Sequence, residues 1–152
     1  MIEVVGNLWT YPAAYRVVTT NGSVRKDGAA VMDRGCAKEA ATKYPFLAHE
    51  LGERLQRGGT VMQFFSRYSL FTFPVKDEWD QRARPSLIEQ SVTELRLLIK
   101  SIDDQALYVL PRPGCGNGGL SWTTVQLLLT ALPDNVHVID FGPVTPLKRR
   151  RS

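Results

Sequence analysis

The clearest periodic pattern lies between Ser86 and Ile102, where hydrophobic side chains recur every three or four residues. Charged and polar residues fill the positions between them. Pro85 directly precedes the segment, and proline is favoured at the start of a helix. The pattern predicts an amphipathic helix beginning at Ser86 whose buried face carries Ile88, Val92, Leu95, Ile99 and Ile102.

Shorter hydrophobic runs, rich in β-branched and aromatic side chains, predict strands over residues 4–5, 15–20, 60–65, 70–75, 106–110 and 136–141. Residues 29–44 and 46–57 have a helical composition, and Ser121 is predicted to cap a last helix that continues to residue 132. Strands and helices alternate through the second half of the chain. We therefore expect an α/β fold, a three-layer α/β/α sandwich with a mixed, largely parallel central sheet.

The chain has 152 residues, 43% hydrophobic and 22% charged, which is typical of one soluble globular domain. Its net charge of +4 lies in the C-terminal run KRRR, without which 15 basic residues balance 15 acidic ones. We expect a neutral domain over residues 1–145 and a basic, disordered tail over 146–152. No secretory or membrane-spanning pattern is visible, so a cytoplasmic protein without a membrane partner is expected.

The two cysteines, Cys36 and Cys115, form no CxxC pair, and His49 and His137 are the only histidines. This set is too small and scattered for a zinc site, and a disulfide is not expected in a cytoplasmic chain. We predict neither a metal nor a cofactor.

A glycine-rich segment, YVLPRPGCGNGGLSW over residues 108–122, connects a predicted strand to a predicted helix. Ligands bind at such connections because the helix N-terminus offers unpaired N–H groups. Glycine lets these groups approach a phosphate or pyrophosphate closely, with a simple tight turn as the alternative.

We compared this loop with two nucleotide-binding motifs. Gly114, Gly116 and Gly119 match the dinucleotide fingerprint G-x-G-x-x-G, and Asp140 follows about 20 residues later. The match comes late in the chain, however, where a dinucleotide-binding unit would need further strands. No lysine follows the glycines, which excludes a P-loop NTPase at this position.

In order and spacing, this loop and other segments resemble the macrodomains, an ADP-ribose-binding α/β/α family. VVTTNGSVRKDGAAVMDRGCAKEAA, from residue 17, resembles their first loop, and VVGNLW, from residue 4, their opening strand and turn. The resemblance implies that Asn21 hydrogen-bonds the distal ribose, while Asn7 stands where an aspartate usually recognises adenine. The ADP-ribose-binding residues that it implies are Asn7, Leu8, Thr20, Asn21, Gly28, Ala29, Ala30, Val31, Pro113, Gly114, Cys115, Gly116, Asn117, Gly118, Gly119 and Leu120.

FTFPVKDEWDQRARPSLIEQSVTEL, from residue 71, is similar to the DarG-type macrodomain antitoxins that remove ADP-ribose from DNA, and to the terminal ADP-ribose glycohydrolases. In these groups the lysine of F-P-x-K is the main catalytic residue, which implies a catalytic Lys76. In a partly dry cleft a lysine loses proton affinity; its free amine can attack an anomeric carbon, and its protonated form can assist a leaving group. Gly118 stands where the terminal glycohydrolases have an aspartate, so their lysine–aspartate pair is absent.

Neighbouring residues bear on the substrate. Asp77 and Glu78 would repel a DNA backbone if they pointed into the cleft. Trp79 could stack on a base or cover the neighbouring helix. Cys115, close to a predicted helix N-terminus, is expected to have a lowered thiol pKa, although packing is its expected role.

The resemblance implies hydrolysis of ADP-ribose from modified DNA, with single-stranded DNA as the candidate partner. Two alternatives use the same pocket: a non-catalytic protein that reads or sequesters ADP-ribose or an NAD-derived signalling nucleotide, and an ADP-ribose 1''-phosphate phosphatase. Lys76 is the residue that separates a catalyst from a reader.

Overall fold

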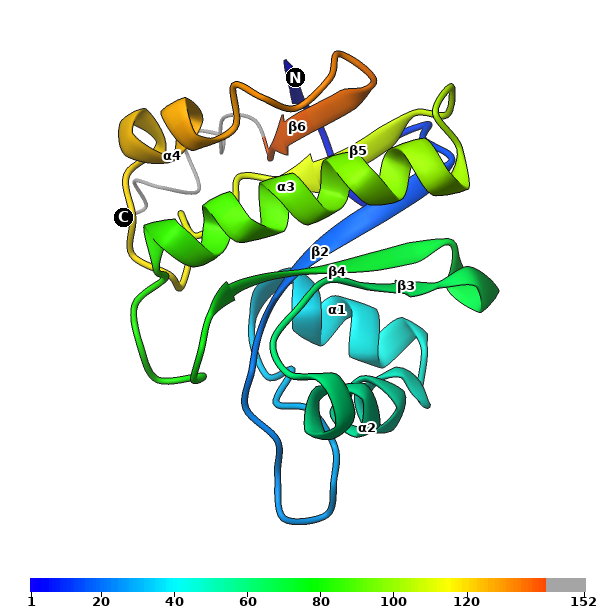
Figure 1. Ribbon diagram of the computed structural model, residues 1–152, viewed down its shortest axis with the longest axis vertical. Coiled ribbons are helices and arrows are strands. Elements are labelled where there is room, and N and C mark those ends of the chain that lie inside the picture. The colour runs from blue at the N-terminus through cyan, green and yellow to red at the C-terminus, as the bar shows by residue number, and fades with distance from the viewer. Residues whose placement is uncertain (142–152) are drawn as a thin grey trace, which may run out of the picture.

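The computed structural model describes residues 1–141. Its strands form one sheet in the order β1-β6-β5-β2-β4-β3 (Figure 1). All neighbouring strands are parallel except β3 and β4, which confirms the predicted mixed, largely parallel sheet. The boundary expected after residue 145 and the basic tail lie outside the described residues. The strands are β1 (Ile2–Val5), β2 (Tyr15–Asn21), β3 (Gln63–Phe65), β4 (Leu70–Lys76), β5 (Tyr108–Pro111) and β6 (Val136–Asp140).

Helices cover both faces of the sheet and complete three layers (Figure 1). One face carries α1 (Gly35–Lys43) and α2 (Leu47–Gly58), and the other carries α3 (Pro85–Ile102) and α4 (Trp122–Leu128). Side chains alternate along β4, so that Phe71 and Phe73 pack with α3 and α4, while Leu70 packs toward α1 and α2. Because both faces are covered, β4 is buried along its whole length.

The helix α3 begins at Pro85, one residue before the predicted start. Proline is tolerated in the first turn because an N–H group at this position would have no acceptor within the helix. Of the side chains predicted to face the core, Ile88, Val92, Leu95 and Ile99 are buried, whereas Ile102 in the last turn is only partly buried. Ser91, which the pattern did not select, is also buried and donates to the Pro74 carbonyl at 2.7 Å.

The helix predicted over residues 29–44 is wrong in its first half, since only Gly35–Lys43 is helical. Val24 and Ala30 form an antiparallel bridge, and the Ala30 N–H donates to the Ala48 carbonyl at 2.8 Å. These bonds to residues outside the segment occupy backbone groups that a helix would need.

The last helix is also shorter than predicted, because α4 ends at Leu128 rather than at residue 132. Its predicted cap is confirmed, since the Thr124 N–H donates to Ser121 Oγ at 3.3 Å. The edge strand β3 begins at Gln63 rather than at residue 60.

The strands β2 and β5 are neighbours, but the chain leaves them toward opposite faces of the sheet. The connection after β2 leads to α1, and the connection after β5 leads to α4 on the other face (Figure 1). In open α/β sheets, ligands bind in the crevice outside the carboxyl ends of strands at such a switch point. The strand order therefore already indicates where a ligand site would lie.

Candidate functional site

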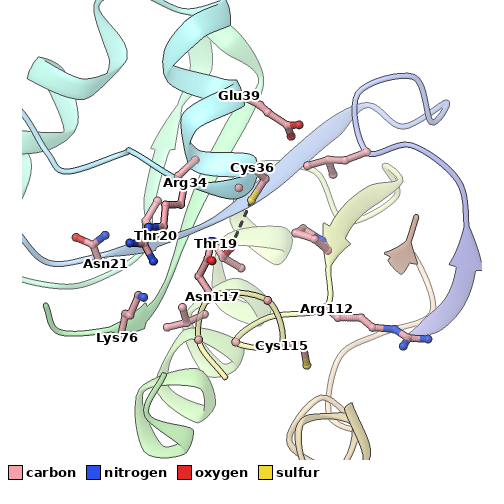
Figure 2. Close-up of a pocket in the computed structure, with 18 of the residues that line it drawn as sticks. Thr19, Thr20, Asn21, Arg34, Cys36, Glu39, Lys76, Arg112, Cys115 and Asn117 are labelled. Carbon is pink, nitrogen blue, oxygen red and sulfur yellow. Dashed lines mark hydrogen bonds between the residues drawn. The ribbon is translucent and has the colours of Figure 1, made fainter. Parts of the chain in front are cut away.

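A cavity of about 780 Å³ opens at the carboxyl ends of the parallel strands (Figure 2). It crosses the sheet from β4 to β6, a distance of three inter-strand spacings or about 14 Å. The lining residues come from the ends of the strands and from the connections after β1, β2, β4 and β5: Gly6, Leu8, Thr19, Thr20, Asn21, Val31, Asp33, Arg34, Gly35, Cys36, Ala37, Glu39, Val75, Lys76, Trp79, Pro111, Arg112, Gly114, Cys115, Gly116, Asn117, Gly118, Leu120, Trp122, Ile139, Asp140 and Phe141.

The glycine loop after β5 forms one wall of this cavity. The Ala83 N–H donates to the Gly118 carbonyl at 2.9 Å, which ties the loop to the connection after β4. A Cβ on Gly118 would lie 2.6 Å from the Gly114 oxygen and 2.7 Å from the Ala83 Cβ, so the packing leaves room only for glycine. The N–H groups of Gly116, Asn117 and Gly118 donate to no other atom within residues 1–141. Consecutive unpaired N–H groups in a concave loop can bind an anion.

The N-terminus of α1 forms the facing wall, which was not predicted from the sequence. Its first-turn N–H groups, at Gly35, Cys36 and Ala37, have no side-chain cap and no backbone acceptor among the described residues. Gly35 has a φ of 58°, and a Cβ placed on it would lie 3.6 Å from Asn117 Nδ2 of the glycine loop. The cavity therefore narrows between two sets of N–H donors, an arrangement suited to adjacent phosphate groups.

Aspartate just before a helix is a sequence signal for its N-terminus, and Asp33 lies one residue before the N-cap Arg34. The predicted helix began at residue 29, however, and so included Asp33 within it.

Asn21 ends β2 at the cavity, and its side chain also organises the loop that follows. Its Nδ2 donates to the Val31 carbonyl at 3.1 Å, and its Oδ1 accepts from the Ser23 N–H at 2.9 Å. Thr20, Asn21 and Val31 line the cavity. The predicted binding residues Gly28, Ala29 and Ala30 do not, because this segment packs against Gly52 of α2.

The turn after β1 contributes Gly6 and Leu8 to the far end of the cavity, but the predicted Asn7 is not among the lining residues. The Asn7 Oδ1 accepts from the Trp9 N–H at 2.8 Å, so this amide stabilises its own turn. In the glycine loop, Pro113 and Gly119 also fall outside the lining, whereas Gly114, Cys115, Gly116, Asn117, Gly118 and Leu120 belong to it.

Lys76 ends β4 beside Asn21 and is only 9% exposed (Figure 2). Burial lowers the pKa of its amine, the guanidinium of Arg34 lowers it further, and the carboxylate of Asp80 raises it. Among residues 1–141 the amine has neither a hydrogen-bond acceptor nor an ion-pair partner. A buried ammonium without a partner is unfavourable, which increases the share of the neutral, nucleophilic amine.

The two acidic residues after Lys76 are engaged outside the cavity. The Asp77 carboxylate accepts two hydrogen bonds from Arg84, at 2.8 and 2.9 Å, and these bonds hold the pKa of Asp77 below its usual value. Glu78 accepts from the Ser23 hydroxyl at 2.6 Å. Neither carboxylate lines the cavity, so neither adds negative charge to its wall.

Trp79 lies at the rim of the cavity next to Lys76 and is 49% exposed. Its backbone N–H donates to the Ser23 hydroxyl at 2.9 Å, which ties it to the loop after β2. About half of its surface is therefore covered by the protein, and the other half is open at the cavity.

Both cysteines line the cavity as free thiols. Burial raises the pKa of Cys36, although Thr19 hydrogen-bonds its sulfur, and burial also raises the pKa of Cys115. The lowered pKa expected for Cys115 is therefore wrong, because burial of the thiol outweighs the lowering effect of the Arg112 guanidinium. Neither cysteine has the character of a reactive thiolate.

No group of three His, Cys, Asp or Glu side chains within residues 1–141 is placed to hold a metal ion. In the same part of the chain no helix combines the length and hydrophobicity needed to cross a membrane.

Comparison with known proteins gives structural matches alone, since no family model and no curated protein matches the chain. The macrodomain of Thermus aquaticus DarG is similar with a TM-score of 0.73 and 25% identity, over 93% of this chain and 97% of that one. The macrodomain of Mycobacterium tuberculosis DarG gives a TM-score of 0.73 at 22% identity, over 91% and 95% of the two chains. Thermosipho africanus DarTG in complex with ADP-ribose gives 0.74 at 17% identity, over 98% of this chain and 44% of that one.

The matches cover nearly the whole chain, and the first two are with the macrodomains of two DarG proteins. They agree with the resemblance noted in the glycine loop and in the FPVK segment. The chain therefore has the macrodomain fold, and its structural likeness is to macrodomains of the DarG type.

Proposed function

We propose that this chain binds ADP-ribose in the cavity and hydrolyses the N-glycosidic bond between ADP-ribose and a base of DNA. The observation that carries the proposal is the buried, unpartnered amine of Lys76 at the end of the cavity where Asn21 ends its strand. The DarTG structure was solved in complex with ADP-ribose, which supports the same ligand for this cavity.

The diphosphate would lie in the narrow part of the cavity. The unpaired N–H groups of residues 116–118 approach it from one side, and those of residues 35–37 approach from the other. Backbone N–H groups and a helix dipole favour a doubly charged diphosphate without a metal ion. With the phosphates there, one ribose reaches toward β4 and the adenosine reaches toward β6 and the turn after β1.

The ribose toward β4 would meet Asn21 and Lys76. Asn21 orients a ribose hydroxyl, and the neutral Lys76 amine attacks the anomeric carbon. The bond from Nζ to that carbon forms as the bond to the base breaks; the base leaves with the electron pair and takes up a proton, while Nζ loses one. Water then hydrolyses the lysine adduct, releases ADP-ribose and restores the amine.

The base itself would lie at the rim, where Trp79 offers an exposed ring. Stacking on an aromatic ring is available to every nucleobase. Asp77 and Glu78 support this placement because their carboxylates are held by Arg84 and Ser23, away from the cavity.

The test uses single-stranded DNA carrying one ADP-ribosylated base and measures released ADP-ribose. The wild type is compared with Lys76→Ala and with Lys100→Ala, which removes an exposed lysine from α3. We expect turnover by the wild type and the Lys100 variant and none by Lys76→Ala, with all three proteins retaining ADP-ribose binding in calorimetry. Equal turnover by all three would refute the role of Lys76.

Two further outcomes distinguish the alternatives. Binding of ADP-ribose without turnover of modified DNA by the wild type would make the chain a reader or sequestering protein. Release of phosphate from ADP-ribose 1''-phosphate, with modified DNA left intact, would make it a phosphatase. No binding of ADP-ribose at all would remove the macrodomain function itself.

A further inference from the structure

We infer that Glu39 of α1 recognises the amino group of adenine, in place of Asn7 in the turn after β1. The inference rests on the proposed function, because it takes the end of the cavity farthest from Lys76 as the adenosine site. Gly6 and Leu8 line that end, and Glu39 lies on the α1 side of the cavity (Figure 2).

The side-chain acceptor of the turn after β1 is engaged within the turn and does not line the cavity. The Asn7 Oδ1 accepts from the Trp9 N–H at 2.8 Å, and Asn7 does not line the cavity. The Asn7 carbonyl accepts from Tyr11 at 2.9 Å, so backbone and side chain together hold the turn closed. Rotating this amide toward a ligand would break a hydrogen bond of the turn.

Glu39 has the free acceptor that Asn7 lacks. Its Oε1 accepts from Trp9 Nε1 at 2.9 Å, which fixes the direction of the carboxylate, while its Oε2 has no partner among the described residues. Glu39 lies three residues after Cys36 and therefore on the same face of α1, the face that lines the cavity.

The other carboxylate at this end is already engaged. Asp140 Oδ1 accepts from the Phe141 N–H at 3.1 Å, and Oδ2 lies 3.7 Å from the Arg112 guanidinium.

A carboxylate acceptor attracts the 6-amino group of adenine and repels the 6-oxygen of hypoxanthine. Glu39 would thus set the choice between these two bases.

The experiment measures dissociation constants for ADP-ribose and for inosine diphosphate ribose, its hypoxanthine counterpart, by calorimetry on the full chain. We expect the wild type to prefer ADP-ribose by about tenfold or more, the range of a good base-edge hydrogen bond. Glu39→Ala should bring the two constants close together. Glu39→Gln should reverse the preference, because Trp9 Nε1 holds the amide oxygen and leaves the NH₂ group facing the base.

Two controls leave Glu39 in place. Lys43→Gln alters the charge beside Trp9, over whose ring the Lys43 amine lies at 5.2 Å, and Asn7→Ser keeps an acceptor for the Trp9 N–H. Both should keep the wild-type ratio, and thermal melting checks that every variant is folded. The inference alone is overturned if the Glu39 variants keep the wild-type ratio of the two dissociation constants. It is also overturned if Asn7→Ser loses that ratio, or if the wild type binds both ligands equally well. Failure of the wild type to bind either ligand overturns the proposed function as well.

Discussion

Asn21 and Lys76 are direct neighbours across the parallel strands β2 and β4, although the register of the preceding residues would have placed Val75 there. Thr20 pairs with Pro74, and Asn21 then pairs with Lys76, so β4 contains one extra residue at this point. Both Val75 and Lys76 consequently line the cavity. The bulge brings the candidate reactive amine beside the candidate ribose anchor.

Replacing Asp80 should shift the pH dependence of turnover. The pKa of Lys76 is lowered chiefly by burial and also by Arg34, and Asp80 opposes both effects. In Asp80→Asn the opposing charge is gone, so the pKa falls further and the neutral amine is populated at lower pH. We expect the rising limb of kcat against pH to move to lower pH, measured on ADP-ribosylated DNA. A shift to higher pH would contradict a neutral-amine mechanism.

Removing the ring of Trp79 should weaken binding of modified DNA more than binding of ADP-ribose. Base stacking on an aromatic ring contributes about 1–3 kcal/mol, which corresponds to roughly 5- to 150-fold in affinity. We expect Trp79→Ala to raise the KM for modified DNA within this range and Trp79→Phe to recover most of the loss. The dissociation constant for free ADP-ribose should change little. A parallel loss for both ligands would mean that Trp79 contacts ADP-ribose or supports the fold instead.

An alanine at Gly118 should disturb the glycine loop, because its Cβ would lie 2.6 Å from the Gly114 oxygen. We expect Gly118→Ala to lower the free energy of unfolding by about 1–3 kcal/mol, the usual cost of overpacking. Gly116→Ala is the matched control, because its Cβ meets no atom within 4 Å. Urea unfolding of the two variants measures the difference, and equal stabilities would contradict the close packing at Gly118.

Tyr108 should make the fold sensitive to alkaline pH. Burial raises its pKa to about 12, and its hydroxyl donates to the Asp103 carbonyl at 2.8 Å. The unfolded tyrosine ionises near pH 10, so stability is fully present below that pH and is lost between about pH 10 and 12. The loss should approach about 2–3 kcal/mol.

Urea unfolding of the wild type and of Tyr108→Phe at pH 9 and pH 11 tests this expectation. Other groups titrate in the same range and affect both proteins alike, so only the difference between them reports on Tyr108. The variant should lose less stability than the wild type on going to pH 11; equal losses would exclude the tyrosine.

Local patterns in the sequence determined most of the secondary structure. The hydrophobic positions of α3, the short strands and the cap at Ser121 depend on residues close together in the chain, so their periodicity and turn chemistry suffice. The glycine loop was recognisable for the same reason. The alternation of strands and helices then restricted the sheet to a largely parallel arrangement.

Tertiary contacts decided the start of α1 and the surroundings of the site. Residues 29–34 are not helical because Ala48 and Val24, both outside that stretch, hold their backbone. Asp77 and Glu78 face away from the cavity because Arg84 and Ser23 bind them.

By itself, then, the sequence determined which elements form and which loop could cradle a phosphate, because these depend on neighbours along the chain. The tertiary structure alone decided that Lys76 stands beside Asn21 and that Glu39, rather than Asn7, lines the cavity. Those relationships depend on strand register and on hydrogen bonds between residues far apart in the sequence, and no local pattern records them.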